Sequence, residues 1–195
     1  MRLFSLPQSS ATVAHAALLE TGEPFELVQG ARRDRVPALD DGGCRICEGA
    51  AILLYLGDRF PSSPLAPAPG TPERADYYQW TVFLASVLQP AFGRWYAPRF
   101  GAAGALAASI AAAAEGTILG CLDACEARLG DRDFLARRFS SADLLLHMLS
   151  GPSWTLELPV LATRPNLAAH HARVDARPAV QAMAQAHARD REAER

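Results

Sequence analysis

Glu48 and Gly49 are the residues of this sequence whose types and position best suit ligand binding. They precede an alanine- and leucine-rich segment, residues 50–56, whose apolar positions predict a largely buried helix. The first turn of a helix has unpaired N–H groups and a partial positive charge, so it receives a carboxylate well. Glycine allows close approach of the backbone, and Glu48 can bind an ammonium group. The pair predicts a site for a zwitterionic α-amino acid end, with helix capping by Glu48 as the alternative.

Cysteines and histidines raise the alternatives of redox and metal chemistry. Cys44 and Cys47 form a C-x-x-C, but redox pairs of this kind lie at the N-terminus of the first helix of a thioredoxin-like fold. Here they fall on a hairpin, where alternation points them to opposite faces, so thiol–disulfide exchange is the least favoured function. His170 and His171 are adjacent and point in different directions, and His147 is expected to be a satisfied core histidine. No metal site is expected.

The Glu48-Gly49 pair belongs to a strand–turn–strand–helix unit. Two short runs, VPAL from Val36 and CRIC from Cys44, flank the turn signal DDGG, which predicts a β-hairpin. Upstream, residues 1–6 and 25–28 have the pattern of strands, and residues 11–20 have helical spacing. The sequence therefore predicts β-α-β followed by β-β-α over residues 1–60, an α/β domain.

The remainder of the chain is predicted to be helical. Prolines are frequent in residues 61–72, which have linker composition and mark the expected domain boundary. Helical patterns then run from residue 73 almost to residue 195, and Gln89-Pro90 is expected to break or kink the first of these helices. Ser140 and Asp143 have the spacing of a reciprocal capping pair at the start of a buried helix. We expect residues 73–195 to form an all-α domain.

Composition excludes several functional classes. The net charge of −2 gives no electrostatic reason to expect nucleic acid or an anionic membrane as a partner. All 19 basic residues are arginine, which excludes a Schiff-base lysine and a Walker-type phosphate loop. The sequence has neither a run of 18 apolar residues nor a hydrophobic leader, so no membrane span and no signal peptide are expected. Four cysteines do not make a disulfide framework, and a reduced cytoplasmic protein is expected.

Residues 36–60 resemble the glutathione transferase family, in which VPAL, a turn, a Glu-Ser pair and AAILxYL form the core of the glutathione site. The FS-x-AD-L pattern at residues 139–144 and the segment at residues 164–183 also match that family's C-terminal domain. The resemblance implies a thioredoxin-like N-terminal domain followed by a C-terminal helical bundle. Only seven residues separate Val28 from Val36, where the family has a helix and a loop, so the second helix is expected to be missing.

The same resemblance implies the residues that hold glutathione. The backbone of Val36, before a cis Pro37, would pair with the cysteinyl part, and Glu48 and Gly49 would hold the charged end. Gly49 stands where the family has serine, so the hydroxyl contact to the glutathione carboxylate is missing and only the backbone N–H remains. Apart from the resemblance, Arg35 lies with Arg32 and Arg33 on the short connection and could meet a ligand carboxylate, with solvation of the three charges as the alternative.

Catalysis would fall to Ser10 or Ser9, which lie where the first helix begins. A hydroxyl hydrogen bond and a helix N-terminus both stabilise a thiolate, and helix capping is the alternative role for either serine. By resemblance, the second domain lines the pocket for the electrophile, with core packing as the alternative for the aromatic residues. The residues expected there are Gln89, Phe92, Trp95 and Tyr96.

These observations predict a glutathione transferase that conjugates glutathione, as co-substrate, to a small apolar electrophile in detoxification, without a metal. The family is usually dimeric, so a homodimer is expected, with neither nucleic acid nor membrane as partner. A glutathione-transferase-like binding or interaction module without catalysis is the alternative. The glycine at position 49 and the shortened N-terminal domain favour that alternative.

Overall fold

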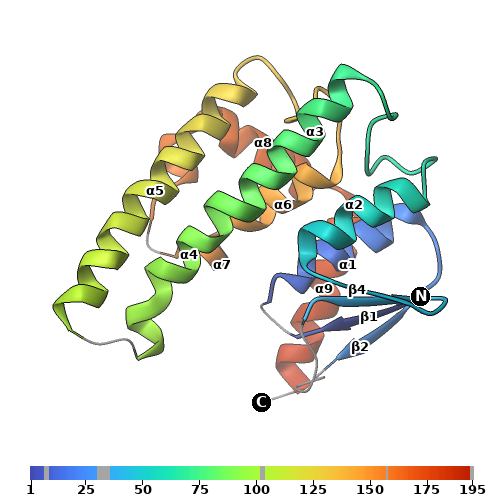
Figure 1. Cartoon of the computed structure of the whole chain (residues 1–195), viewed down its shortest axis with the longest axis horizontal. Helices are drawn as coiled ribbons and strands as arrows, with labels where there is room; N and C mark the ends of the chain where they lie inside the picture. The colour runs from blue at the N-terminus through green and yellow to red at the C-terminus, as the bar shows by residue number, and fades with distance from the viewer. Residues whose placement is uncertain (7–8, 30–35, 102–103, 157, 194–195) are drawn as a thin grey trace.

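A small sheet carries the N-terminal part of the molecule, and helices make up most of the rest (Figure 1). The computed structural model describes residues 1–6, 9–29, 36–101, 104–156 and 158–193. The strands are β1 (Arg2–Ser5), β2 (Glu26–Gln29), β3 (Ala38–Asp41) and β4 (Cys44–Cys47). The helices are α1 (Ala11–Thr21), α2 (Gly49–Arg59), α3 (Pro72–Phe83), α4 (Gln89–Tyr96), α5 (Ala105–Leu129), α6 (Ser141–Ser150), α7 (Pro152–Thr155), α8 (Pro165–Asp175) and α9 (Pro178–Ala193). Shorter turns are η1 (Leu84–Leu88), η2 (Ala97–Phe100) and η3 (Leu161–Thr163).

The sheet has the strand order β2-β1-β3-β4. β1 and β2 are parallel, with α1 as the crossover, whereas β3 is antiparallel to both β1 and β4. α1 and α2 pack against each other and against this sheet, α1 on β1 and α2 on β3 and β4. The predicted β-α-β and β-β-α order is confirmed, and the fold is a thioredoxin-like region followed by a mostly helical region.

The β3–β4 hairpin differs from the expected one in its bounds. The turn is Gly42-Gly43, with φ angles of 57° and 96°, and Asp40 and Asp41 belong to β3. Two consecutive positive φ angles suit a tight hairpin turn and favour glycine at both positions. At its other end, β3 begins after Pro37, two residues later than the VPAL run suggested.

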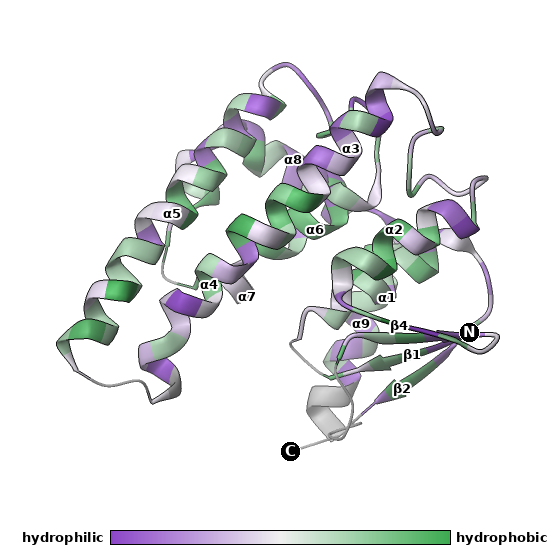
Figure 2. Ribbon diagram, in the orientation of Figure 1, coloured by the Kyte–Doolittle hydropathy of each residue, from purple (hydrophilic) through white to green (hydrophobic). Residues whose placement is uncertain are grey.

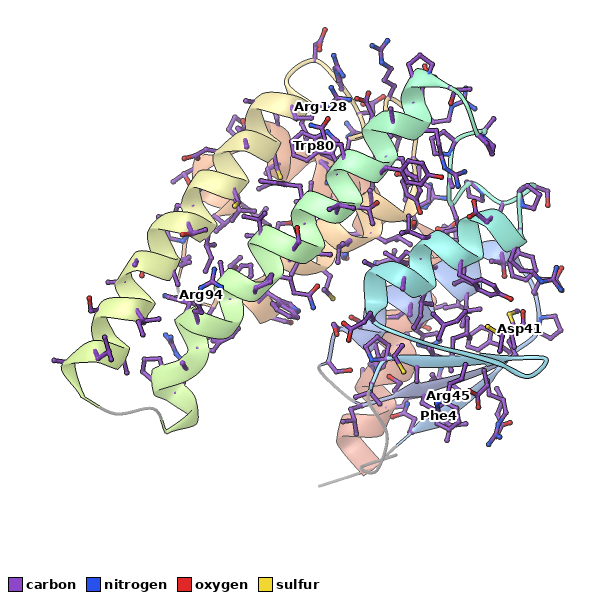
Figure 3. The ribbon with its side chains drawn as sticks, in the orientation of Figure 1. Phe4, Asp41, Arg45, Trp80, Arg94 and Arg128 are labelled. Atoms are coloured by element: carbon purple, nitrogen blue, oxygen red, sulfur yellow. The ribbon has the colours of Figure 1, made fainter. Side chains whose placement is uncertain are left out.

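Phe4 lies on the side of the sheet away from α2, together with Arg45 (Figure 3). The guanidinium carbons of Arg45 and Arg2 lie 4.8 and 5.3 Å from the centre of its ring. Cation–π contacts of this kind cover an apolar ring without burying the charge. The segment in which the second helix was expected to be missing, residues 30–35 with Arg35, lies outside the described residues.

The proline-rich segment between α2 and α3 is held against the helices. Leu65 is fully buried, and its carbonyl accepts a hydrogen bond of 2.8 Å from the N–H of Ser141. Arg74, also buried, donates to the carbonyl of Pro67 at 2.8 Å and pairs with Asp58. These contacts fix the path of a segment whose composition alone suggested an extended linker.

A π-helical turn takes the place of the kink expected at Gln89-Pro90. Over Leu84–Leu88 the helix widens, and the N–H of Gln89 bonds to the carbonyl of Leu84, five residues back. Pro90 has no N–H to continue the regular pattern, and a wider turn absorbs the missing bond. The helix then continues as α4.

α5 is the one described helix that is long and apolar enough to cross a membrane, judged by length and composition only. The core helix of a soluble protein passes the same test. α5 packs against α4 and α8 and buries one side, including Ile118, Leu122 and Cys125. Leu106 and Ile110, near its beginning, are exposed and form the hydrophobic end visible in Figure 2.

α6 packs on both parts of the molecule, because it contacts α1 and α2 as well as α3, α7 and α8. α9 also packs against α1. The predicted capping box is present at the start of α6. The carboxylate of Asp143, which is fully buried, accepts hydrogen bonds of 2.9 Å from the N–H groups of Ser140 and Leu135 and one of 3.1 Å from the Ser140 hydroxyl. His170 Nε2 lies 3.0 Å from the same carboxylate.

The buried cap gives a stability prediction. Asp143→Ala would leave two buried N–H groups without an acceptor, and we expect a loss of about 3 kcal/mol in the free energy of unfolding. Asp143→Asn keeps the shape and one acceptor oxygen, so about half that loss is expected. Urea unfolding at fixed protein concentration measures both.

Asp133→Asn is the matched control, because it removes an exposed carboxylate that pairs with Arg173 on α8. A surface pair of this kind contributes within about 0.5 kcal/mol. If Asp143→Ala were no more harmful than Asp133→Asn, the buried cap would not hold α6 in place.

Candidate functional site

A cleft of about 930 Å³ opens where the sheet region meets the helical region. Its walls come from the start of α1, the turn before β3, the start of α2, the helices η1, α4 and η2, and the segment around α7. The predicted site residues that line it are Ser9, Ser10, Val36, Pro37, Glu48, Gly49, Gln89 and Tyr96. Segments far apart in the sequence therefore place these eight residues around one space.

The start of α2 forms the charged side of the cleft. Val36-Pro37 is a cis peptide bond and precedes β3, and the carbonyl of Glu48 accepts the first bond of α2, from Ile52 at 3.0 Å. Glu48 has a φ of 70°, in the region that favours glycine, so its backbone is strained. Strain of this kind is found where a residue must present its groups in one direction.

Gly49 occupies the first position of α2 with room around it. A Cβ atom added there would lie 3.8 Å from Pro37 Cγ and 3.8 Å from Val13 Cγ1, which are ordinary van der Waals distances. A serine would therefore fit at this position, and neither space nor backbone geometry requires glycine.

Ser9 and Ser10 differ in what their hydroxyl groups do. The Ser9 hydroxyl donates to the carbonyl of Leu6 at 2.7 Å and accepts from the N–H of Ala11 at 3.2 Å, so it closes the turn into α1. Ser10 has no side-chain cap bond, lines the cleft, and is partly buried. Capping, the alternative role for both serines, thus applies to Ser9.

The opposite wall is built around Tyr96. Its hydroxyl donates to the carbonyl of Trp154, which links α4 to α7, and burial raises the pKa of the phenol, so it stays protonated at neutral pH. Phe92 and Trp95 were expected on this wall, but both are buried in the core and neither lines the cleft. Phe92 packs behind the wall, with its ring centre 5.5 Å from that of Trp154.

Sequence reasoning missed Arg99 and the residues around α7. Arg99 lines the cleft, and its guanidinium carbon lies 4.6 Å from the centre of the Trp95 ring. Its spacing of three residues after Tyr96 was a usable signal, since residues three apart share a helix face. Trp154, Ser153 and Leu156 line the cleft only because of tertiary packing, which no local pattern reveals.

A second cavity, of about 280 Å³, adjoins the cleft and shares Ser9, Ser153 and Trp154 with it. His147, expected to be a core histidine, lies here with its ring stacked on that of His171, 4.2 Å between ring centres. Burial, and then the neighbouring His171, lower the pKa of His147 to about 4, and burial lowers the pKa of His171. Both rings are therefore neutral at pH 7. His15 and His187 also meet, 3.2 Å apart.

Solved structures similar to this chain include bacterial glutathione transferases. A sphingomonad glutathione S-transferase, solved in complex with glutathione, is 33% identical, with a TM-score of 0.82 over 96% of this chain and 99% of that one. BphK, a bacterial glutathione S-transferase solved as a ternary complex, is 30% identical, with a TM-score of 0.85 over 96% of this chain and 100% of that one.

Curated relatives agree over shorter segments. Glutathione S-transferase GstA of Escherichia coli O157:H7 is 28% identical over 115 residues, which are 50% of this chain and 57% of that protein. Glutathione S-transferase Z2 of Arabidopsis thaliana is 44% identical over 55 residues, 28% of this chain and 24% of that protein. Both matched segments span less than two thirds of these relatives, and no family model matches the chain. Identity and coverage against the solved structures show that the chain belongs to the glutathione S-transferase family.

The strained backbone of Glu48 gives a second stability prediction. Glycine adopts a φ of 70° freely and alanine does not, so Glu48→Gly should be more stable than Glu48→Ala by about 1 kcal/mol. Thermal and urea unfolding of the two variants, without ligand, measure the difference. Equal stabilities would mean that position 48 carries no strain.

Proposed function

We propose that this protein is a glutathione transferase, an enzyme that joins the thiolate of glutathione to a small apolar electrophile. One observation carries the proposal. Ser10, Glu48 and Gly49 border a single cleft at the N-terminal ends of two helices, opposite a mostly apolar wall.

The start of α2 would hold the charged end of glutathione. That end carries an ammonium group, for which Glu48 supplies the one carboxylate among the described residues that line the cleft. It also carries a carboxylate, for which the first-turn N–H groups of α2 are suited. Val36, before Pro37, would pair with the cysteinyl part through its backbone. The sphingomonad relative was solved in complex with glutathione, which supports glutathione as the ligand. Arg35, the other residue expected to contact glutathione, lies outside the described residues.

Ser10 would stabilise the thiolate. Its hydroxyl lies at the beginning of α1, where the helix dipole also favours a negative charge. Ser9 is a weaker candidate because its hydroxyl proton is already donated to the carbonyl of Leu6.

The electrophile would bind against the opposite wall. That wall presents apolar side chains, among them Ala85, Pro90 and Trp154. Its polar groups are Gln89, Tyr96, Arg99 and Ser153. The thiolate would attack the electrophile there, and the leaving group would depart into the open cleft. With these features we propose a cytoplasmic, homodimeric detoxification enzyme.

A binding or interaction module without catalysis remains the second candidate, favoured by the glycine at position 49. The two candidates differ in a simple assay. The enzyme binds immobilised glutathione and conjugates 1-chloro-2,4-dinitrobenzene, whereas the module folds and does not conjugate.

Removing the two serine hydroxyls separately tests the catalytic role. A hydrogen bond to a charged group contributes about 1.5–3 kcal/mol, so Ser10→Ala should lower kcat by about 10- to 100-fold at pH 7, with glutathione still bound. Ser9→Ala should instead lower the free energy of unfolding by about 1 kcal/mol and leave kcat within about threefold. Steady-state kinetics with chlorodinitrobenzene and urea unfolding separate the two effects.

An unchanged kcat for Ser10→Ala, in a protein that conjugates, would remove Ser10 from the mechanism. Wild-type protein that folds and yet neither binds glutathione nor conjugates it would overturn the transferase proposal as a whole.

Restoring the family's serine tests the binding mode. Gly49→Ser has room for its side chain and adds a hydroxyl beside the proposed carboxylate position, so KM for glutathione should fall about 5- to 10-fold. Gly49→Ala adds the same Cβ atom without the hydroxyl and should leave KM within about twofold. Equal effects of the two variants would mean that the carboxylate lies elsewhere.

A further inference from the structure

Three side chains that no sequence pattern had connected meet on the wall of the second cavity. His147 comes from α6, and His171 and Asp175 come from α8, which packs against α6. One ligand atom from each of the three lies within 4.8 Å of the other two. His171 and Asp175 are four residues apart, so they share one face of α8.

We propose that His147, His171 and Asp175 form a binding site for one divalent transition-metal ion of the zinc type. Two imidazole nitrogens and one carboxylate oxygen are a donor set that such ions prefer. Three protein ligands leave the fourth tetrahedral position open, and here it would face the 280 Å³ cavity.

One distance within the cluster already matches that of a zinc ligand set. His147 Nε2 lies 3.3 Å from Asp175 Oδ1, and bonds of 2.0–2.1 Å to a tetrahedral zinc ion place two ligand atoms about 3.4 Å apart. The two stacked imidazole planes are inclined by 18°, so each ring has to tilt for its lone pair to reach a common centre. The side chain of Asp175 is exposed, so its carboxylate can move with the tilted rings to stay within reach of the ion.

The surroundings of His171 support its role as a ligand. Ser150 Oγ lies 3.3 Å from His171 Nδ1, which leaves Nε2 for an ion and gives the ring the second contact that metal-bound histidines ordinarily have. Gly151 lies directly beside the ring, and a Cβ atom there would come within 3.3 Å of His171 Cε1. The neighbouring His170 points the other way, toward Asp143, and does not contribute.

The proposal is tested by metal binding, not by conjugation, so its outcome is independent of the proposed transferase activity. Tag-free protein, treated with EDTA and dialysed without thiols, is titrated with zinc chloride at pH 7.5 by calorimetry. One ion per chain is expected. His171→Ala should weaken binding at least about 100-fold and Asp175→Asn at least about 10-fold, since even indirect partners of a metal ligand account for 10- to 100-fold.

Two controls separate the cluster from other sources of zinc affinity. Asp133→Asn removes an exposed carboxylate that pairs with α8 through Arg173, and should leave zinc affinity within about twofold. The double variant Cys44→Ser and Cys47→Ser removes the exposed and part-buried thiols of β4 and should also bind one zinc ion.

Cobalt(II) adds a spectroscopic readout. Binding at the cluster gives weak visible bands without the near-ultraviolet charge-transfer absorption of a thiolate ligand. Three outcomes would each overturn the proposal. The wild type does not bind zinc, or His171→Ala and Asp175→Asn both bind zinc as tightly as the wild type does, or only the double cysteine variant loses binding. If His171→Ala does not fold, Asp175→Asn still tests the proposal. The Asp175 side chain is exposed, so replacing it is not expected to unfold the protein.

Discussion

The hydrogen bonds of one buried carboxylate fix the start of α6, a helix that packs on both the sheet region and the helical region. Asp143 joins the loop before α6 through Leu135, the cap of α6 through Ser140, and α8 through His170. A buried carboxylate is costly unless its donors are all in place, so this arrangement permits one starting point for α6. Since α6 contacts both α1 and α2, that starting point, together with the packing of α9 on α1, sets how the sheet region meets the helical region.

The two walls of the cleft therefore have different origins. The wall at Glu48 and Gly49 follows from the local order of hairpin and helix, which the chain encodes within a short segment. The wall at Trp154 follows from the end of α6, because Gly151 both ends that helix and begins α7. The Tyr96 hydroxyl, which donates to the Trp154 carbonyl, then ties this wall to α4. The width of the cleft thus depends on where packing places α4, α6 and α7 relative to the start of α2, and not on the hairpin and helix sequence alone.

Local rules explain what the sequence predicted. The hairpin, α2 and the capping box each depend on residues within about four positions of one another, and all three are present. For Phe92 and Trp95 these local rules gave the wrong environment. Helical spacing placed them near Tyr96 on α4, but it does not say which part of that surface faces the core and which faces the cleft. Only the position of α7 decides that Tyr96 and Trp154 line the space while Phe92 packs behind them.

The histidines also show that local spacing does not identify contacts between different helices. Adjacency correctly predicted that His170 and His171 diverge. The expectation of no metal was made for the whole chain, without considering that His171 could meet a histidine from another helix. Divergence sends His170 to the buried cap and turns His171 toward His147 on another helix, a partner that spacing within α8 cannot reveal. One signal was available, since Asp175 follows His171 by one helical turn. The same α6–α8 packing that satisfies Asp143 therefore also creates the histidine cluster, and the cavity beside it reaches the cleft at Ser9, Ser153 and Trp154.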